Sequence, residues 1–244
     1  MYLDHVVHFV DKTPQQTADF WQRLGYPALV GGQHLKWGTH NALLYGKDCY
    51  IEWLAIRDLQ TAEDANHPLV NLFLNDRKGF GTVCLRTASI AEVNERLLAD
   101  GIRTSGVMDA ERQTSTGDLI RWKLLFIEEP ISEGLPAPFF IEWEEDDETR
   151  YENLRSAGMA SPASESMEIE RCVFGVHDTE ASEERWRTIL GGDLQLENCL
   201  LTFQQTDRPQ ERLEQVRFKD GTQKVAFEEG VYCLPPSGNN KGSN

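Results

Sequence analysis

Hydrophobic and polar positions along the chain follow a pattern that predicts one unit of secondary structure three times. The first unit opens with residues 3–10 (LDHVVHFV), a run rich in β-branched and apolar residues that favours a strand. A helix start follows, with Thr13 as N-cap, Pro14 in the first turn and Gln16 three residues after the cap. Strand-like runs come after the helix and end with 49–56 (CYIEWLAI). The first unit is therefore predicted to be β-α-β-β-β.

The same pattern recurs twice further along the chain. The second unit starts with the strand-like run 80–87 (FGTVCLRT), continues with a helix that Ser89 caps, and ends with 139–144 (FFIEWE). The third starts with 169–176 (IERCVFGV), followed by a helix that Asp178 or Thr179 caps and by further strand-like runs. A pattern found repeatedly in one chain is stronger evidence than any single segment.

These units predict an α+β fold in which repeated β-α-β-β-β modules form an open curved barrel, with a third, partial module beside it. The stretch between the second and third units is charged and then rich in Ala, Ser and Pro, which favours a short helix and a linker. The predicted boundaries are a paired-module domain at 1–145, split into 1–78 and 79–145, a linker at 146–166, a third module at 167–234 and a disordered tail at 235–244.

Composition narrows the range of partners. The net charge of −16 argues against nucleic acid or an anionic membrane as a partner, because both need a basic surface. The start of the chain lacks the features of a signal peptide, and no run approaches the length of a membrane span. The five cysteines are scattered and lack the spacing of a zinc motif, which suits a reducing compartment. We therefore expect a cytoplasmic protein.

The tripeptide Ile-Glu-Trp occurs in the last strand of both of the first two units, and places Glu52 and Glu142 there. Because side chains alternate faces along a strand, each glutamate lies opposite its neighbouring tryptophan, and for a single half-exposed strand the ordinary interpretation places the tryptophans in the core and the glutamates in solvent. The repeat favours a different arrangement, in which the two carboxylates converge on the concave face of one curved sheet. His5 in the first strand is placed to join them, and two carboxylates with a histidine suit a divalent cation.

The repeated unit, together with the pattern WGTHNALLYG…YIEWLAI…GFGTVCLRT…DLIRWKLLF…FFIEWE, resembles the vicinal-oxygen-chelate superfamily. That superfamily includes glyoxalase I, ring-cleaving dioxygenases and fosfomycin- and bleomycin-resistance proteins. The chain is most similar to the uncharacterised glyoxalase-like domains of bacteria. The resemblance is strong over about residues 3–144, and the third unit resembles the partial extra module of such proteins.

The resemblance implies a metal held by residues on the first and last strands of two modules. Transferred residue by residue, the ligands are His5, Glu52 and Glu142, and the metal would be Zn, Mn, Ni or Fe. The fourth ligand position falls on Thr82, where the superfamily has a histidine, glutamate or glutamine. In the third unit the histidine position falls on Arg171. The departure at Thr82 leaves open a pocket that binds its ligand without a metal.

Three further residues are candidate contacts of a small-molecule ligand. Asn41 could both donate and accept hydrogen bonds, although a turn around it could equally explain its presence. Arg86 could bind a carboxylate or phosphate, or form an ordinary ion pair. Trp122 could line the pocket or simply pack in the core.

Two classes of function follow from the resemblance, and a third from the extra unit. The first is an enzyme acting on a small oxygen-rich molecule, as a lyase, isomerase or dioxygenase, with Glu52 and Glu142 as its catalytic residues and one of them as a candidate proton-transfer base. The second is a non-catalytic small-molecule-binding or resistance-type protein without a metal. The third is an interaction module whose last unit pairs with another subunit, for example in a homodimer.

Overall fold

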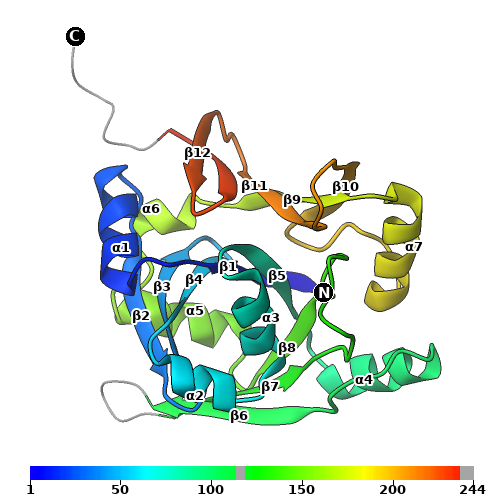
Figure 1. Cartoon of the computed structure of the whole chain (residues 1–244). Helices are drawn as coiled ribbons and strands as arrows, with labels where there is room; N and C mark the ends of the chain where they lie inside the picture. Colours follow the sequence, from blue (N-terminus) through cyan, green and yellow to red (C-terminus); the bar gives the residue numbers. More distant parts are fainter. Residues whose placement is uncertain (114–118, 237–244) are drawn as a thin grey trace.

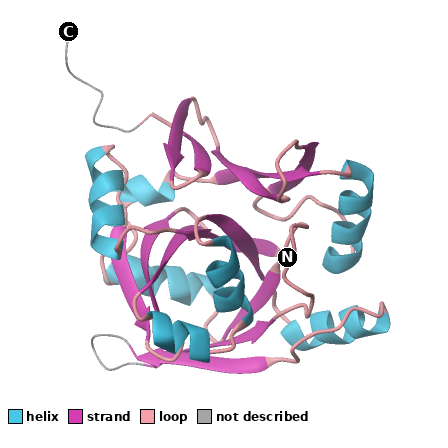
Figure 2. Ribbon diagram, viewed as in Figure 1, coloured by secondary structure: helices cyan, strands magenta, loops and turns pink. Residues whose placement is uncertain are grey.

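The computed structural model describes residues 1–113 and 119–236, and it shows two β-sheets with helices around them (Figures 1 and 2). The described strands of the first sheet are β1 (Tyr2–Phe9), β2 (Leu29–His34), β3 (Thr39–Tyr45), β4 (Tyr50–Ile56), β5 (Gly79–Arg86), β6 (Met108–Gln113), β7 (Leu119–Leu125) and β8 (Phe139–Trp143). Their order across the sheet is β2-β3-β4-β1-β5-β8-β7-β6. Figure 1 shows this sheet curling into a half-barrel.

The helices are α1 (Pro14–Arg23), α2 (Leu59–Asp64), α3 (Pro68–Asp76), α4 (Ile90–Ala99), α5 (Asp147–Ser156), α6 (Pro162–Glu165) and α7 (Thr179–Leu190). The predicted capping box of α1 is present, since Thr13 accepts from the Gln16 amide and Gln16 accepts from the Thr13 amide. Ser89 caps α4 and Asp178 caps α7, as the sequence predicted. Among the described helices, none is long and apolar enough to cross a membrane.

The first sheet joins two modules in the predicted way. In each module the first strand lies parallel to the last: β1 pairs with β4, and β5 pairs with β8. The two modules meet where β1 and β5 run antiparallel. The predicted α+β class and the curved sheet of paired β-α-β-β-β modules are therefore confirmed.

The two faces of the first sheet have different coverings. On the concave face, here called the inner face, Val7, Leu54 and Cys84 pack in a core with Leu72 and Phe73 of α3. The convex face, here called the outer face, packs in a larger core against α1, α4, α7 and the second sheet. Both faces of the central strands are therefore buried, which explains why their sequences show little alternation of polar and apolar residues.

The third segment forms the second sheet, with strands β9 (Ile169–Val176), β10 (Leu200–Gln205), β11 (Arg212–Phe218), β12 (Gln223–Phe227) and β13 (Gly230–Leu234). Its order is β10-β9-β11-β13-β12, with β9 parallel to β10, antiparallel to β11, and β11 parallel to β13. The middle of the first sheet, β4-β1-β5-β8-β7, has the same order and the same directions. The third segment thus contains the sheet expected of an extra module, arranged like the core of a module pair.

The strand registers match individual positions of the two sheets residue by residue. His5 lies opposite Tyr50 and Cys84 in the first sheet, and Arg171 lies opposite Leu200 and Arg217 in the second. The irregular position in the first strand also matches. Asp4 is an extra residue between two β1–β5 pairs, and Glu170 is the same in β9.

The two sheets also contact each other through matching positions. The Lys47 amide donates to the Met167 carbonyl (2.9 Å), and the Glu197 amide donates to the Met1 carbonyl (3.1 Å). By the strand registers, Lys47 in the first sheet corresponds to Glu197 in the second, and Met1 corresponds to Met167. Each sheet therefore donates one of these hydrogen bonds from the same position and accepts the other at the same position. Reciprocal contacts of this kind are what a twofold interface produces. Figure 2 shows the second sheet lying across the outside of the first.

The expected linker contains two helices, α5 and α6, and the first of them packs against the first sheet through Arg150. Most of the expected disordered tail, residues 237–244, lies outside the described residues.

Candidate functional site

A β-bulge in the first strand creates the polar centre of the inner face. Leu3 pairs with Leu85 and His5 pairs with Cys84, so Asp4 is the extra residue between two consecutive pairs. The bulge places the Asp4 carboxylate beside the imidazole of His5, whose Nδ1 donates to Asp4 Oδ1 at 2.8 Å. Both side chains are almost completely buried. An ionised carboxylate only accepts hydrogen bonds, so Asp4 fixes the proton of His5 on Nδ1 and leaves Nε2 facing away from it.

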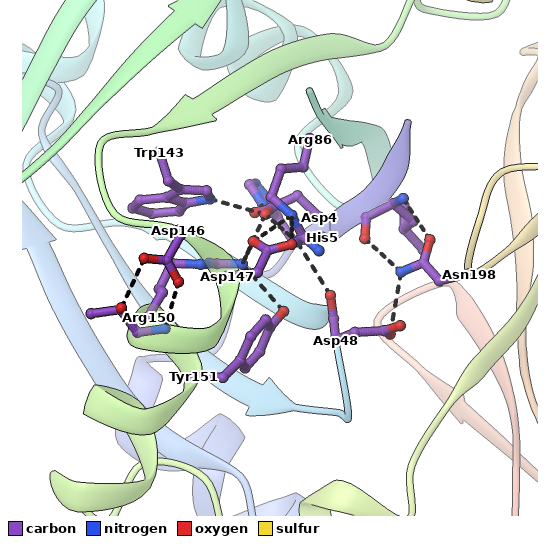
Figure 3. A network of polar contacts seen from close by, with 12 residues as sticks. Asp4, His5, Asp48, Arg86, Trp143, Asp146, Asp147, Arg150, Tyr151 and Asn198 are labelled. Atoms are coloured by element: carbon purple, nitrogen blue, oxygen red, sulfur yellow. Dashed lines mark hydrogen bonds and ion pairs between the residues drawn. The ribbon is translucent and has the colours of Figure 1, made fainter. Parts of the chain in front are cut away.

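Asp4 is the most heavily bonded carboxylate of the centre. Its Oδ2 accepts from Arg86 (2.9 Å), from the Trp143 indole (3.0 Å) and from Arg150 (3.4 Å), as Figure 3 shows. Burial alone would raise the pKa of Asp4. The cations Arg150 and Arg86 and the hydrogen bond from His5 more than offset this, and lower that pKa well below its ordinary value. Asp4 is therefore ionised at neutral pH and holds two buried guanidinium groups.

Glu52 extends the polar line on the other side of His5. His5 Nε2 and Glu52 Oε2 lie 3.6 Å apart, and Asn41 Nδ2 donates to Glu52 Oε1 at 2.6 Å. These side chains meet because β1, β4 and β3 are neighbours and each contributes an inner-face position. The Tyr50 ring stacks on His5 with 4.5 Å between ring centroids. The predicted neighbours His5 and Glu52 are thus brought together, with Asn41 orienting the glutamate.

Glu142 does not join this group, which corrects the expectation that the two glutamates converge. In β8, Phe139 and Ile141 pack in the inner-face core and Phe140 packs in the outer-face core, so Glu142 lies on the side of Phe140. The two copies of the tripeptide therefore stand in opposite phase on their strands, and such a change of phase moves a side chain to the other face. Glu142 instead accepts from the Ile90 amide at the start of α4 (2.7 Å) and pairs with Lys123 (3.0 Å).

The remaining candidates are placed as follows. Thr82 is buried and donates to the Ala137 carbonyl (2.9 Å), so its hydroxyl is already in use. Arg86 is buried and bonded to Asp4 and Asp147 rather than open to a ligand. Trp122 lines a groove of about 1120 Å³ at the open side of the half-barrel, together with Trp37 and Trp143. We call this space the tryptophan groove.

The groove and the polar centre are connected through Trp143. Its ring forms part of the groove wall, and its indole nitrogen donates to Asp4. The Trp122 and Trp143 ring centroids lie 5.5 Å apart, and Trp37 is the third aromatic wall of the groove. A ligand bound against these rings would therefore contact Trp143, the side chain that joins the groove to Asp4.

Metal binding can be tested against the donor atoms. One ligand atom each from Asp4, His5 and Cys84 lies within 4.8 Å of the others, so this buried group could hold a metal ion. However, a cation there would compete with Arg86 and Arg150 for Asp4. Burial, reinforced by nearby carboxylates, also raises the pKa of the Cys84 thiol well above its ordinary value, whereas a metal binds the thiolate. The set predicted from the sequence lacks Glu142, so it does not fit the usual three protein ligands.

Sequence reasoning missed two residues of the centre. Asp4 stands beside His5 as an acidic residue inside an otherwise apolar strand, and that signal could have identified it. Arg150 lies in a highly charged stretch, where nothing distinguishes a buried arginine from an exposed one. In the structure it is buried between the Trp143 and Tyr151 rings, with its guanidinium carbon 4.6 Å and 4.7 Å from their centroids.

Comparison with known proteins agrees with this architecture. A family model described as "Glyoxalase-like domain" matches residues 3–190. The chain belongs to the glyoxalase-like domain family. This family lies within the vicinal-oxygen-chelate superfamily that the sequence resembled. No curated protein matches the chain.

One solved structure supports the fold of this glyoxalase-like protein over nearly its whole length. A hypothetical protein from Staphylococcus aureus superposes with a TM-score of 0.77 at 22% identity, over 94% of this chain and 97% of that one. The match therefore includes the second sheet. Methylmalonyl-CoA epimerase from Mycobacterium tuberculosis has a TM-score of 0.40 at 19% identity, over 61% of this chain and 91% of its own. A hypothetical protein from Bacillus halodurans has a TM-score of 0.40 at 16% identity, over 59% and 94%.

Proposed function

We propose that this glyoxalase-like protein binds a small oxygen-rich molecule between its two modules and moves a proton on it with His5 and Glu52. The observation that carries the proposal is the continuous line Asp4–His5–Glu52–Asn41 on the inner face. An acid–base pair works best when its members are oriented by further groups, and here a carboxylate orients the histidine and an amide orients the glutamate.

The chemistry would be removal and return of a proton next to a carbonyl group. His5 Nε2 is the base, because Asp4 holds the proton of the neutral ring on Nδ1. Glu52 Oε2 is close enough to receive from Nε2 the proton taken from the ligand, through a small movement or one water. The tryptophans of the groove would bind the apolar part of the ligand by contact with their rings. No metal enters this scheme, because Asp4 is already occupied by two arginines.

A binding protein without catalysis is the second candidate. It is favoured by the near-complete burial of His5 and Glu52 and by the hydrogen bond that occupies the Thr82 hydroxyl. In that case the same centre would recognise ligand oxygens and exchange no proton.

One experiment separates the two. The protein is incubated in D₂O with a panel of small ketones, 2-oxo acids and 2-hydroxy acids. Proton NMR then follows deuterium uptake next to the carbonyl or hydroxyl group, and thermal shift reports binding. We expect at least one compound to bind and to exchange, and Glu52→Gln to slow exchange by about 100-fold or more while binding remains. Binding without exchange would favour the binding protein, and a panel that neither binds nor exchanges would contradict the proposal.

A further inference from the structure

A second cavity, of about 380 Å³, lies apart from the tryptophan groove and shares no lining residue with it. We call it the α3 cavity. One wall is the first half of α3, with Pro68, Leu69 and Leu72, and the opposite wall is the segment 126–139. Most of its lining side chains are apolar, and its size falls in the range that holds a small ligand.

The second sheet holds both walls of this cavity in place through one arginine. Arg212, at the start of β11, forms two bonds to Asp76 at the end of α3, at 2.7 Å and 2.8 Å. The same guanidinium donates to the carbonyls of Ser132 (3.1 Å) and Gly134 (2.8 Å) in the opposite wall. Arg212 and Asp76 are both largely buried. A rigid planar fork of this kind fixes two chain segments at a set separation.

The cavity has a cation on its wall that no carboxylate pairs with. Arg103 is exposed to solvent and, within residues 1–113 and 119–236, forms no ion pair. The first turn of α3 contributes Pro68 and Leu69 to the wall, and its N-cap residue, His67, makes no side-chain capping bond. Two carboxylates also line the cavity. Glu129 is paired with Arg185 and accepts from the Ala137 amide (2.7 Å), whereas Glu128 is exposed to solvent.

A buried histidine beside the cavity lacks partners. His67 is only 8% exposed, and neither ring nitrogen has a hydrogen-bond partner in the described structure. Its ring packs against Trp37 of the tryptophan groove at 4.3 Å between centroids, and on the other side meets Phe126, which lines the α3 cavity, edge-on at 5.1 Å. His67 is not itself a lining residue of the cavity, but the next residue, Pro68, is part of the wall. Burial lowers the pKa of His67 to about 4, so the ring is neutral at neutral pH and offers one donor and one acceptor. Buried polar atoms are ordinarily paired, so a partner in the cavity would satisfy it.

We propose that the α3 cavity is a second binding site, for a small carboxylic acid with an apolar body. The body packs between Leu69, Leu72 and Phe126, and the carboxylate meets Arg103 at the positive end of α3. His67 supplies a hydrogen bond to the ligand or to a water beside it. Arg212 is a positioning residue that keeps the two walls at the separation the ligand needs. This gives the second sheet a role in ligand binding on the first.

Phenylacetate and its neutral amide, phenylacetamide, are suitable probes, with binding to the full chain followed by chemical shifts of backbone amides. We expect phenylacetate to shift the amides of α3 and of 126–139, and to bind more tightly than the amide. Arg103→Gln should weaken phenylacetate binding by about tenfold, as loss of a charged hydrogen bond does, and Arg121→Gln in the groove should leave it unchanged. Equal affinity for acid and amide, or shifts confined to the groove, would overturn the proposal.

The role of Arg212 has its own test. Arg212→Lys keeps the charge but loses the fork, so it should weaken phenylacetate binding while Arg103 is intact. Arg217→Lys, on an exposed position of the same strand, is the control and should have no effect. Unchanged binding in Arg212→Lys would show that the arginine does not position the walls. Glu52→Gln should leave phenylacetate binding intact, so failure of this site and failure of the proton-transfer proposal can be told apart.

Discussion

The two sheets of this protein share one strand pattern, but among residues 1–113 and 119–236 the buried polar centre belongs to the first sheet alone. Where the first sheet has His5, the second has Arg171, and Thr202 stands at the position of Glu52. The position of Asp4 is taken by Glu170, which is exposed to solvent. The same backbone arrangement therefore supports two chemically different surfaces.

The difference comes from what covers each sheet. The outer faces of both sheets pack together in one core, so the inner face of the second sheet is left turned to solvent. The inner face of the first sheet is closed by α3, and Arg150 of α5 binds to its polar centre. A charge in water needs no partner, whereas a buried charge must be paired and hydrogen-bonded. Closure of the inner face, rather than the strand pattern, is therefore the reason that Asp4 needs buried partners.

The largest expected effect follows from removing the charge at the two equivalent acidic positions. Asp4→Asn leaves two buried arginines without their carboxylate, and should lower the free energy of unfolding by about 3–5 kcal/mol. Glu170→Gln changes an exposed residue and should alter it by no more than about 0.5 kcal/mol. Urea denaturation of the two variants measures this. Similar losses for both would show that the two sheets do not differ in the way described.

A second contrast lies on the outer face, at His8 and its counterpart Phe174. His8 is fully buried, donates from Nε2 to the Glu228 carbonyl (3.0 Å) and accepts from the Tyr232 hydroxyl, which ties the two sheets together. Burial lowers the pKa of His8 to about 4. Between this pH and the ordinary pKa of 6.5, His8 binds a proton in the unfolded chain but not in the folded one. The free energy of unfolding therefore falls as the pH drops from about 6.5 towards 4.

This contribution should amount to about 3 kcal/mol, since each pKa unit corresponds to about 1.4 kcal/mol. His8→Phe introduces the residue of the second sheet and should remove that part of the acid sensitivity. His67 has a pKa lowered to a similar value, so part of the pH dependence should remain. Urea melts of wild type and His8→Phe at neutral and mildly acidic pH provide the check. An unchanged pH dependence in the variant would count against the assignment.

The smallest expected effect concerns metals. Because Asp4 is committed to two arginines, added Zn²⁺, Mn²⁺ or Ni²⁺ should raise the melting temperature by no more than about 1 °C, and a chelator should not lower it. A rise of several degrees that Glu52→Gln abolishes would show that the inner face of the first sheet does hold a cation.

Sequence patterns predicted the modules well because repeated strands and helix caps are local signals. Thr13, Ser89 and Asp178 cap the helices where expected. His5 and Glu52 lie close together because β1 pairs with β4, as expected for the first and last strands of one module. The face of Glu142 could not be read in the same way. Its strand is apolar on both faces, so the alternation pattern does not show which face Glu142 occupies.

The covering of the inner face by α3 could also not be predicted from the sequence. The predicted units leave residues 57–79 without an element, but this segment contains α2 and α3, and α3 packs against the inner face of the sheet. Its N-cap residue, His67, gives no capping bond and so gave no helix signal. The contacts of Arg150 and Arg212 join residues more than a hundred positions apart, and only the folded chain brings them together.

In the proposed mechanism, Asp4 orients His5 so that Nε2 is free to take and return a proton beside Glu52. Nitrogen-15 NMR of the neutral His5 ring in the folded protein tests this most directly. We expect Nδ1 to carry the proton, because it donates to Asp4, and Nε2 to be unprotonated. A neutral ring with its proton on Nε2 and a bare Nδ1 would show that Asp4 does not orient His5 in this way.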